Sequence, residues 1–335
     1  MAVTPTAPRP GRPLRLAVTL GDPRGIGPEV AAAAVRYARS LPDGPELVFV
    51  GPEGTCADGA PVHSFHAIGR WDGSGNPEIA GALAGRAIEA ATAMALDGAV
   101  DAIVTAPIDK AALNAGGFSY PGHTEMLAAL VGRRMGTAAP PVAMMMVAEE
   151  TALGGPLRVV LATTHIALRA VPDALSTRLF VEQARLAADG LRRGWRIERP
   201  RIALCAVNPH ASDGGLFGDE EARILEPARD ALRDKGIDAT GPVPADTVFV
   251  RAIRGEFDVV VAPYHDVGMA AFKTAAFGKG VNVTVGLPFV RTSPDHGTAF
   301  DIAGRGIADP GSMIEALVLA ARLARNGAAA QSSGI

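Results

Sequence analysis

The chain has 335 residues, of which 48% are hydrophobic and 20% charged, and its formal net charge is −3. This balance excludes a strongly basic or acidic protein, so neither nucleic acid nor an anionic membrane surface is indicated as a partner. The length exceeds what one hydrophobic core usually organises, and we therefore expect two lobes.

The N-terminal segment and the cysteines bear on the compartment. Met1–Pro13 contains four prolines but no apolar core of the length a signal peptide needs, so we expect a disordered tail over residues 1–13. No later stretch approaches the roughly 18 uninterrupted apolar residues of a membrane span. Of the two cysteines, Cys205 falls in an apolar run and is predicted to be a buried hydrophobe, which fits a reducing cytoplasm.

Strand-like apolar runs alternate with helical segments along the first third of the chain. These elements are expected at residues 14–20 (strand), 30–40 (helix), 47–51 (strand), 78–96 (helix) and 102–105 (strand). The alternation predicts a mainly parallel sheet with helices on its faces. Farther on, Val142–Ala148 and Arg158–Thr164 are predicted to pair antiparallel, which would make the sheet mixed.

Two turns could hold an anion. Gly21–Gly27 joins the first strand to the first helix, so its backbone N–H groups can face an anion or a polar ligand. The second turn, Tyr120–Glu125, precedes a helical run that starts at Met126. Helix-start amides with His123 and Thr124 as donors suit a phosphate. The alternative is a capping turn in which Thr124 only satisfies the helix end.

Three histidines each follow a strand-like run: His165, His210 and His265. Histidine is the commonest metal ligand, and function in α/β proteins gathers where strands give way to loops. One such histidine is usually a hydrogen-bonded structural residue, but the threefold repetition favours one shared divalent ion.

Further polar residues lie in the second half of the chain. The segment Gly241–Thr247 is rich in proline and is expected to lack regular structure, with Asp246 as either a turn residue or a catalytic carboxylate. Lys273 follows the apolar stretch Met269–Phe272, which argues against a simple solvent-exposed position.

Seven motifs together resemble one family, the 4-hydroxythreonine-4-phosphate dehydrogenases of vitamin B6 biosynthesis and their relatives acting on 4-phospho-D-threonate and 4-phospho-D-erythronate. They run from residue 19 to residue 306, nearly the whole chain. The motifs are TLGDPRGIGPE (19–29), GHTE (122–125), TTHI (163–166), NPHA (208–211), PADT (244–247), YHD (264–266) and GVNVTVGLPFVRTSPDHGTAFDIAGRG (280–306).

The resemblance implies an α/β fold of two α/β/α lobes with a cleft between them, similar to isocitrate and isopropylmalate dehydrogenases. Residues 14–125 with 275–330 would form a cofactor-side lobe, and residues 126–274 a metal and dimerisation lobe. The expected assembly is a homodimer with the active site at its interface.

The resemblance also assigns roles to residues. His165, His210 and His265 match metal ligands, the last supplied by the partner subunit. The phosphorylated substrate would be bound by His123, Thr124, Lys273, Asn282 and Arg291. A similarity of His296–Gly304 to an adenine-binding loop places the nicotinamide cofactor near Asp295, His296, Gly297 and Thr298. Val267 and Ala271 depart from the family pattern, which leaves the exact substrate open.

The implied reaction is the NAD- or NADP-linked oxidation, with decarboxylation, of 4-phosphohydroxy-L-threonine or a closely related 4-phosphorylated acid. The ion would be Zn²⁺, Mg²⁺ or Co²⁺, and the proton would go to Asp246, Asp266 or Lys273. A 4-phospho-D-threonate or 4-phospho-D-erythronate 3-dehydrogenase is the alternative. More distant alternatives are a metal-dependent hydrolase and a binding protein without catalysis.

Overall fold

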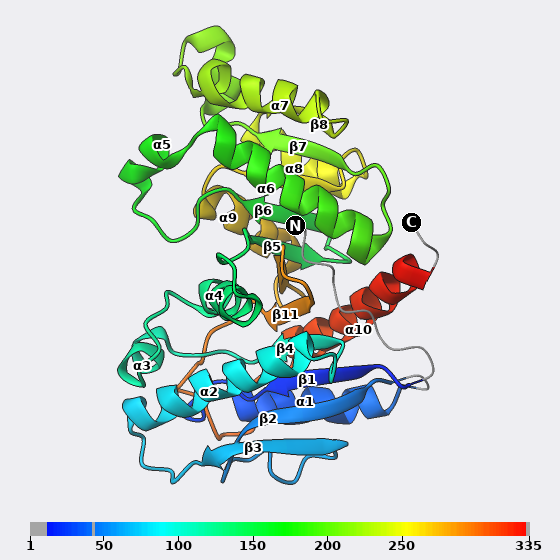
Figure 1. The fold of residues 1–335 in the computed structure, drawn as a ribbon. Coiled ribbons are helices and arrows are strands. Elements are labelled where there is room, and N and C mark those ends of the chain that lie inside the picture. Colours follow the sequence, from blue (N-terminus) through cyan, green and yellow to red (C-terminus); the bar gives the residue numbers. More distant parts are fainter. Residues whose placement is uncertain (1–11, 42–43, 333–335) are drawn as a thin grey trace. The chain divides into compact units, whose positions relative to one another are not determined.

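The computed structural model describes residues 12–41 and 44–332, with only the backbone for residues 328–332. The chain forms two compact units, residues 1–141 with 287–335 (unit 1) and residues 142–286 (unit 2) (Figure 1). Of the expected tail, residues 1–11 lie outside the described part, whereas Arg12 forms an ion pair with Asp101 at 2.7 Å.

The division differs from the expected boundaries after residues 125 and 274, and packing explains why. Helix α4 (His123–Met135) contacts α2 (Pro77–Leu96), so it stays whole within unit 1. Strand β10 (Val281–Val285) pairs antiparallel with β5 (Ala143–Ala148), which keeps it in unit 2.

The described part of unit 1 contains five strands in the order β3-β2-β1-β4-β11, and each pair of neighbours is parallel. The connections β1–α1–β2 and β3–α2–β4 run in opposite directions along the sheet, so right-handed crossovers place α1 and α2 on opposite faces. The remaining elements of the unit are β1 (Arg15–Thr19), α1 (Gly27–Arg39), β2 (Glu46–Glu53), β3 (Ser64–Arg70), β4 (Ala102–Thr105), α3 (Lys110–Ala115), β11 (Val290–Pro294) and α10 (Gly311–Ser332).

Helix α2 is, within the described ranges, the one helix long and apolar enough by composition to cross a membrane. Its apolar window is 56% buried inside the protein. Small residues allow this burial, since a Cβ added at Gly81 would lie 1.8 Å from the Ala112 carbonyl oxygen of α3. The helix therefore packs as a core element.

Unit 2 contains six strands in the order β10-β5-β6-β9-β7-β8. The pairs that β5 makes with β6 and β10 are antiparallel, which confirms the predicted hairpin, and the other pairs are parallel. Its further strands and helices are β6 (Leu157–Leu161), α5 (Val171–Ala174), α6 (Thr177–Gly190), β7 (Arg201–Cys205), α7 (Glu226–Arg233), β8 (Asp238–Val243), α8 (Ala245–Ile253), β9 (Val259–Ala262) and α9 (His265–Ala276). Short 3₁₀ or π turns lie at Leu168–Ala170, Leu191–Trp195, Pro209–Gly215 and Glu221–Leu225.

One expectation about unit 2 is wrong. The proline-rich segment 241–247 is regular, because β8 runs to Val243 and α8 begins at Ala245, directly after Pro244. Proline fixes φ near the value that an extended strand end or the residue before a helix requires, so it ends one element and starts the next. Cys205, by contrast, is fully buried in the core, as predicted.

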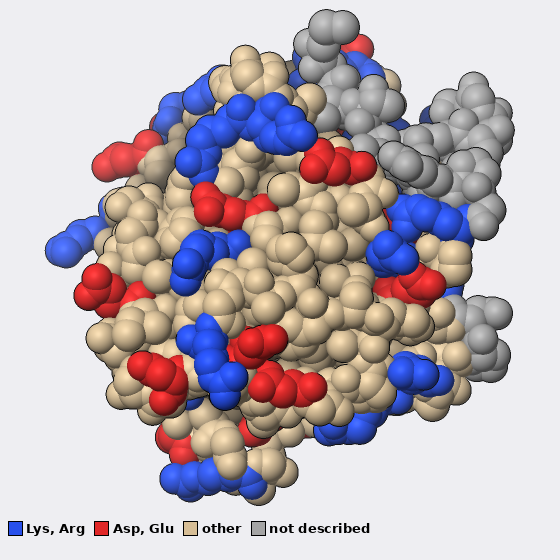
Figure 2. Space-filling model, turned by 60° about the horizontal axis from the view of Figure 1, so that its bottom comes forward, with Lys and Arg blue, Asp and Glu red and all other residues tan. Residues whose placement is uncertain are grey.

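The surface drawn in Figure 2 carries basic and acidic side chains close to one another. The described residues of the protein form several ion pairs between exposed groups, such as Arg134 with Asp97 at 2.8 Å and Arg133 with Glu89 at 3.4 Å. Exposed pairs of this kind contribute only about 0–1 kcal/mol each, so packing of the two cores dominates stability.

Candidate active-site residues

Two of the three histidines lie together in unit 2. Strands β6 and β9 are parallel neighbours, so the segments that follow them leave the sheet at the same edge. His165 lies four residues after β6, and His265 is the first residue of α9. Their ring centroids are 5.5 Å apart and the ring planes are inclined by 43°.

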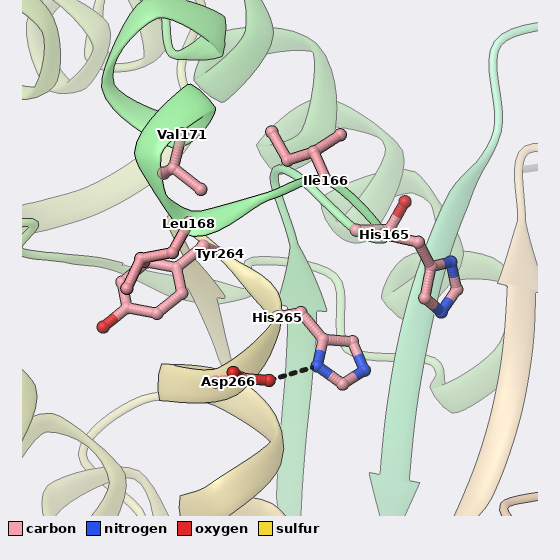
Figure 3. Close-up of a pocket in the computed structure, with 8 residues that line it drawn as sticks. His165, Ile166, Leu168, Val171, Tyr264, His265 and Asp266 are labelled. Atoms are coloured by element: carbon pink, nitrogen blue, oxygen red, sulfur yellow. Dashed lines mark hydrogen bonds and ion pairs between the residues drawn. The ribbon is translucent and has the colours of Figure 1, made fainter.

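The carboxylate of Asp266 orients His265. Nδ1 of His265 and Oδ1 of Asp266 are 2.7 Å apart, and the other ring nitrogen points away from Asp266 toward His165 (Figure 3). A carboxylate on the second nitrogen is the usual support of a metal-ligating imidazole. The two histidines open into a pocket lined by Thr164, His165, Ile166, Leu168, Val171, Tyr264, His265 and Asp266.

His210 does not join this pair within one chain. The 3₁₀ segment after β7 is left-handed, with φ between 47° and 73° from His210 to Gly214, and the His210 ring lies 6.4 Å from the ring of Phe217. Among the residues that the structure describes, no three His, Cys, Asp or Glu side chains are placed to hold one metal ion. Within the described residues, the structure therefore brings two of the three predicted ligands together.

The other predicted residues of unit 2 lie on three different elements. Asp246 is exposed in the first turn of α8, whereas Lys273 is half-buried on α9. Asn282 lies on β10, and its buried Oδ1 has no hydrogen-bond partner among the described residues. Asp246, Asp266 and Lys273 all stay candidates for the general base.

A second group of predicted residues comes together in unit 1. Arg291 on β11 is 2% exposed and donates hydrogen bonds from Nε and Nη2 to Oγ1 of Thr105, at 3.2 and 2.7 Å. Burial lowers the pKa of Arg291 to about 9, and the charge of Glu125 opposes this shift. Burial, and then the positive charges of Arg291 and Lys110, hold the pKa of His123 well below its ordinary value, so this imidazole is neutral at pH 7.

His123 and Thr124 open helix α4, and the observed cap decides against a capping role for Thr124. The cap residue is Gly122, and within the described part of the chain no side chain accepts a hydrogen bond from the first turn. Free amides at a helix start attract an anion. The Nε2 atom of His123 is also buried without a partner among these residues. Helix start, Arg291 and Lys110 together suit a phosphate group.

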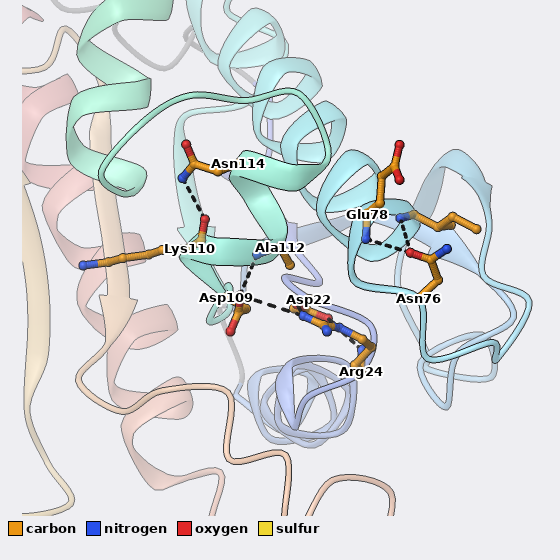
Figure 4. Close-up of polar contacts among 9 residues, drawn as sticks. Asp22, Arg24, Asn76, Glu78, Asp109, Lys110, Ala112 and Asn114 are labelled. Carbon is orange, nitrogen blue, oxygen red and sulfur yellow. Dashed lines mark hydrogen bonds and ion pairs between the residues drawn. The ribbon is translucent and has the colours of Figure 1, made fainter.

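Sequence reasoning did not assign Thr105, Lys110 or Arg24 to the site. Thr105 ends β4, and the loop after it leads to Asp109, which caps α3 by accepting a hydrogen bond from the Ala112 amide at 2.6 Å. Figure 4 shows Lys110 extending from α3, with Asp109 beside the pair of Asp22 and Arg24. Their position after two strands was the signal that could have identified these residues. Strands β1 and β4 are parallel neighbours, so the loops that follow them meet at one edge of the sheet.

The predicted cofactor residues form an irregular segment, residues 295–304, after β11. The Asp295 amide donates to Oγ of Ser312 at 3.1 Å, and the Thr298 carbonyl accepts from the Ile26 amide at 2.9 Å. Nε2 of His296 is buried and, in the described ranges, has no partner, while a Cβ added at Gly297 would meet nothing within 4 Å. A buried imidazole nitrogen without a partner is a position at which a polar ligand could bind.

Comparison with known proteins identifies the family. The model of the pyridoxal phosphate biosynthetic protein PdxA matches residues 62–320. The chain belongs to the PdxA family. It is 44% identical to the 4-hydroxythreonine-4-phosphate dehydrogenase of Methylorubrum populi, over 92% of this chain and 94% of that protein. The crystal structure of 4-hydroxythreonine-4-phosphate dehydrogenase from Klebsiella pneumoniae superimposes with a TM-score of 0.77 at 41% identity, covering 93% of this chain and all (100%) of that one.

Membership of the PdxA family makes the chain an oxidoreductase, a dehydrogenase acting on CH–OH groups. The family assignment decides against the hydrolase and the non-catalytic binding protein. The isocitrate dehydrogenase of Methylococcus capsulatus, at a TM-score of 0.51 and 19% identity over 95% of this chain and 88% of that one, shares the fold. This likeness confirms the predicted fold class.

Proposed function

We propose that the chain is a metal-dependent, NAD- or NADP-linked dehydrogenase that oxidises and decarboxylates 4-phosphohydroxy-L-threonine or a closely related 4-phosphorylated acid. The observation that carries the substrate class is the anion group of unit 1, in which the uncapped start of α4 lies with Arg291 and Lys110. The substrate named for the relatives carries a phosphate, which such a group would bind.

The phosphate is the part of the substrate that unit 1 would hold. Arg291 can offer charge-assisted hydrogen bonds, and neutral His123 can donate one without adding a buried charge. Lys110 adds a second positive charge in reach of His123. Positioning the substrate by its unreactive phosphate would fix its hydroxyl for the chemical step.

The chemical step needs a hydride acceptor and a proton acceptor. Hydride would leave the third carbon of the acid for the nicotinamide, and the hydroxyl proton would pass to Lys273, Asp246 or Asp266. The product is a β-keto acid, which loses carbon dioxide. The His296–Thr298 segment, with its unsatisfied imidazole nitrogen, would bind the nicotinamide cofactor.

A divalent ion would be held by His165 and His265 together with a histidine from a second copy of the chain. When bound, the ion supplies Lewis-acid polarisation of the substrate oxygen. Exposed apolar side chains flank the predicted ligands, with Ile166 and Leu168 44% and 68% exposed after His165, and Leu216 and Phe217 71% and 46% exposed after His210. Such surfaces mark protein contacts, which supports a homodimer.

The test is reduction of NAD and NADP with each candidate substrate: 4-phosphohydroxy-L-threonine, 4-phospho-D-threonate and 4-phospho-D-erythronate. We expect a signal that a chelator abolishes and a divalent ion restores. Arg291→Met should raise KM for the phosphorylated acid about 10–100-fold, the effect of one charge-assisted hydrogen bond. Arg133→Met, which removes an exposed arginine paired with Glu89, is the matched control. No reduction with any of these acids would refute the proposal.

A further inference from the structure

We propose that Arg24 is a positioning residue that holds the 295–304 segment in shape through the ring of Phe300, and so sets the affinity for the nicotinamide cofactor. The inference rests on the proposed cofactor position at residues 295–298. The guanidinium carbon of Arg24 lies 4.9 Å from the centre of the Phe300 ring. A guanidinium over an aromatic face is attracted by the electrons of the ring.

Arg24 is itself held rigidly. Its Nε and Nη2 donate to the two carboxylate oxygens of Asp22 at 3.0 and 2.6 Å, and its own amide donates to Asp22 at 2.9 Å (Figure 4). Asp22 is 1% exposed, and its amide donates to the Pro107 carbonyl at 3.0 Å. The hydrogen bonds to Asp22 raise the pKa of Arg24, so the guanidinium stays charged. A two-pronged bond fixes the plane of the group as well as its place.

The 295–304 segment needs such support because part of its backbone is strained. Ala299 has a φ of 42°, a left-handed conformation that costs about 1–3 kcal/mol for a residue other than glycine. The Ile26 amide donates to the Thr298 carbonyl on one side, the Gly304 amide donates to Glu29 at 3.0 Å on the other, and the Ile302 amide donates to the Ala299 carbonyl at 3.1 Å between them. In this middle part Phe300 is 43% exposed, and the guanidinium of Arg24 stacks on its ring.

The same arginine also reaches toward the loop that follows β4. Nη2 of Arg24 lies 4.0 Å from Oδ1 of Asp109, the cap of α3. The next residue, Lys110, faces His123 in the anion group. Arg24 therefore contacts groups at the start of α3 and in the 295–304 segment, both within unit 1. Its contact with Phe300 is the direct one, so we expect the larger effect on the cofactor.

The experiment measures NADH binding by fluorescence titration of the full-length protein, with steady-state KM values for the cofactor and the phosphorylated acid alongside. Arg24→Ala should weaken NADH binding about tenfold and raise the cofactor KM in parallel, with less than a threefold change in the KM of the acid. Arg24→Lys should weaken NADH binding nearly as much as Arg24→Ala, because an ammonium has neither the planar face nor the two-pronged bond of a guanidinium. Arg15→Ala is the control, since it removes a similar pair with Glu46 at 2.7 and 3.0 Å elsewhere in unit 1.

Variants of the ring separate positioning from a general loss of stability. Phe300→Ala should reproduce the loss, and Phe300→Tyr should restore wild-type binding. The double variant Arg24→Ala/Phe300→Ala should bind NADH no more weakly than the weaker-binding single variant, because both changes break the same contact. Additive losses, unchanged NADH binding in Phe300→Ala, or equal rises in both KM values would overturn the inference. If wild-type protein neither binds NADH nor reduces NAD or NADP, the proposed function fails instead.

Discussion

His123 and Arg291 show how burial sets the charge of a basic side chain. Two basic side chains lie close together at the start of α4, and both lose affinity for protons because burial disfavours their charged forms. Arg291 remains charged at neutral pH with a pKa of about 9, whereas His123 gives up its proton. The result is a site with enough positive charge for a phosphate and with a neutral imidazole beside it.

The first prediction concerns the protonation of His123. The pKa of His123 in the native protein is lowered below the ordinary 6.5 of the unfolded chain. At pH values between the native and the unfolded pKa, the unfolded chain therefore binds more protons than the native one. Stability should therefore fall as pH drops below about 6.5, by at most about 1.4 kcal/mol per pH unit for this group. An NMR titration should show the His123 ring resonance unchanged from pH 7.5 to 6.5, because the imidazole stays neutral over this pH range.

Lys110→Met provides the internal comparison for that titration. Removing a neighbouring positive charge should raise the pKa of His123, although burial keeps it below the ordinary value. A His123 resonance that titrates near pH 6.5 in the wild-type protein, or that does not respond to this substitution, would contradict the assignment.

At the level of elements, the sequence was informative wherever apolar pattern and topology agreed. The strands before His165, His210 and His265 and the antiparallel pairing of β5 with β6 could be predicted, because buried strands read as continuous apolar runs. The regular structure at 241–247 was missed because proline usually interrupts elements. The left-handed path from His210 could not be foreseen, since residues other than glycine seldom adopt this conformation.

Glu221 holds the backbone just before this path, and it leads to a second prediction. This carboxylate is 2% exposed and accepts hydrogen bonds from the amides of Val207 and Asn208 at 2.9 and 2.7 Å, just before His210. Glu221→Gln should lower the free energy of unfolding by about 1–3 kcal/mol, because an amide is a weaker acceptor and adds a donor to a buried place. Urea unfolding measures this loss, and Glu220→Gln, its half-buried neighbour, should change it by less than half as much.

Helix α9 depends on a close approach to the sheet, which gives a third prediction. A Cβ added at Gly268 would lie 2.6 Å from Cδ2 of Leu161 and 3.1 Å from Cβ of Ala262. Gly268→Ala should destabilise the protein by about 1–3 kcal/mol through overpacking. It should also weaken zinc binding, because the displaced helix would move His265, which lies one turn before Gly268. Calorimetry and zinc titration test both effects. Gly59→Ala, where a Cβ meets nothing within 4 Å, should leave both unchanged.

At the level of the molecule, each unit carries part of the proposed site. Unit 1 holds the anion group and the 295–304 segment, and unit 2 holds the pair of His165 and His265. Within the described residues, the third predicted ligand does not join that pair. A homodimer with shared metal sites follows as the proposed assembly, and subunit mixing can test it.

The fourth prediction is that two inactive variants complement each other. His210→Ala and His265→Ala should each be inactive and bind little metal, but unfolding and refolding them together should restore about a quarter of wild-type activity. Random pairing makes half of the dimers mixed, and each mixed dimer has one intact site of two. Metal content measured on the same samples should rise with activity, and failure of every mixture would refute sharing.

Two further mixtures identify the histidine that crosses between chains. If His165 and His265 of one chain act together, as their 5.5 Å ring separation indicates, then His165→Ala mixed with His210→Ala regains activity, and His165→Ala mixed with His265→Ala does not. If His265 crosses instead, as the family resemblance implies, the two results are exchanged. Because each mixture contains the same substitutions as its inactive parents, regained activity can arise only from the way ligands are divided between the two chains.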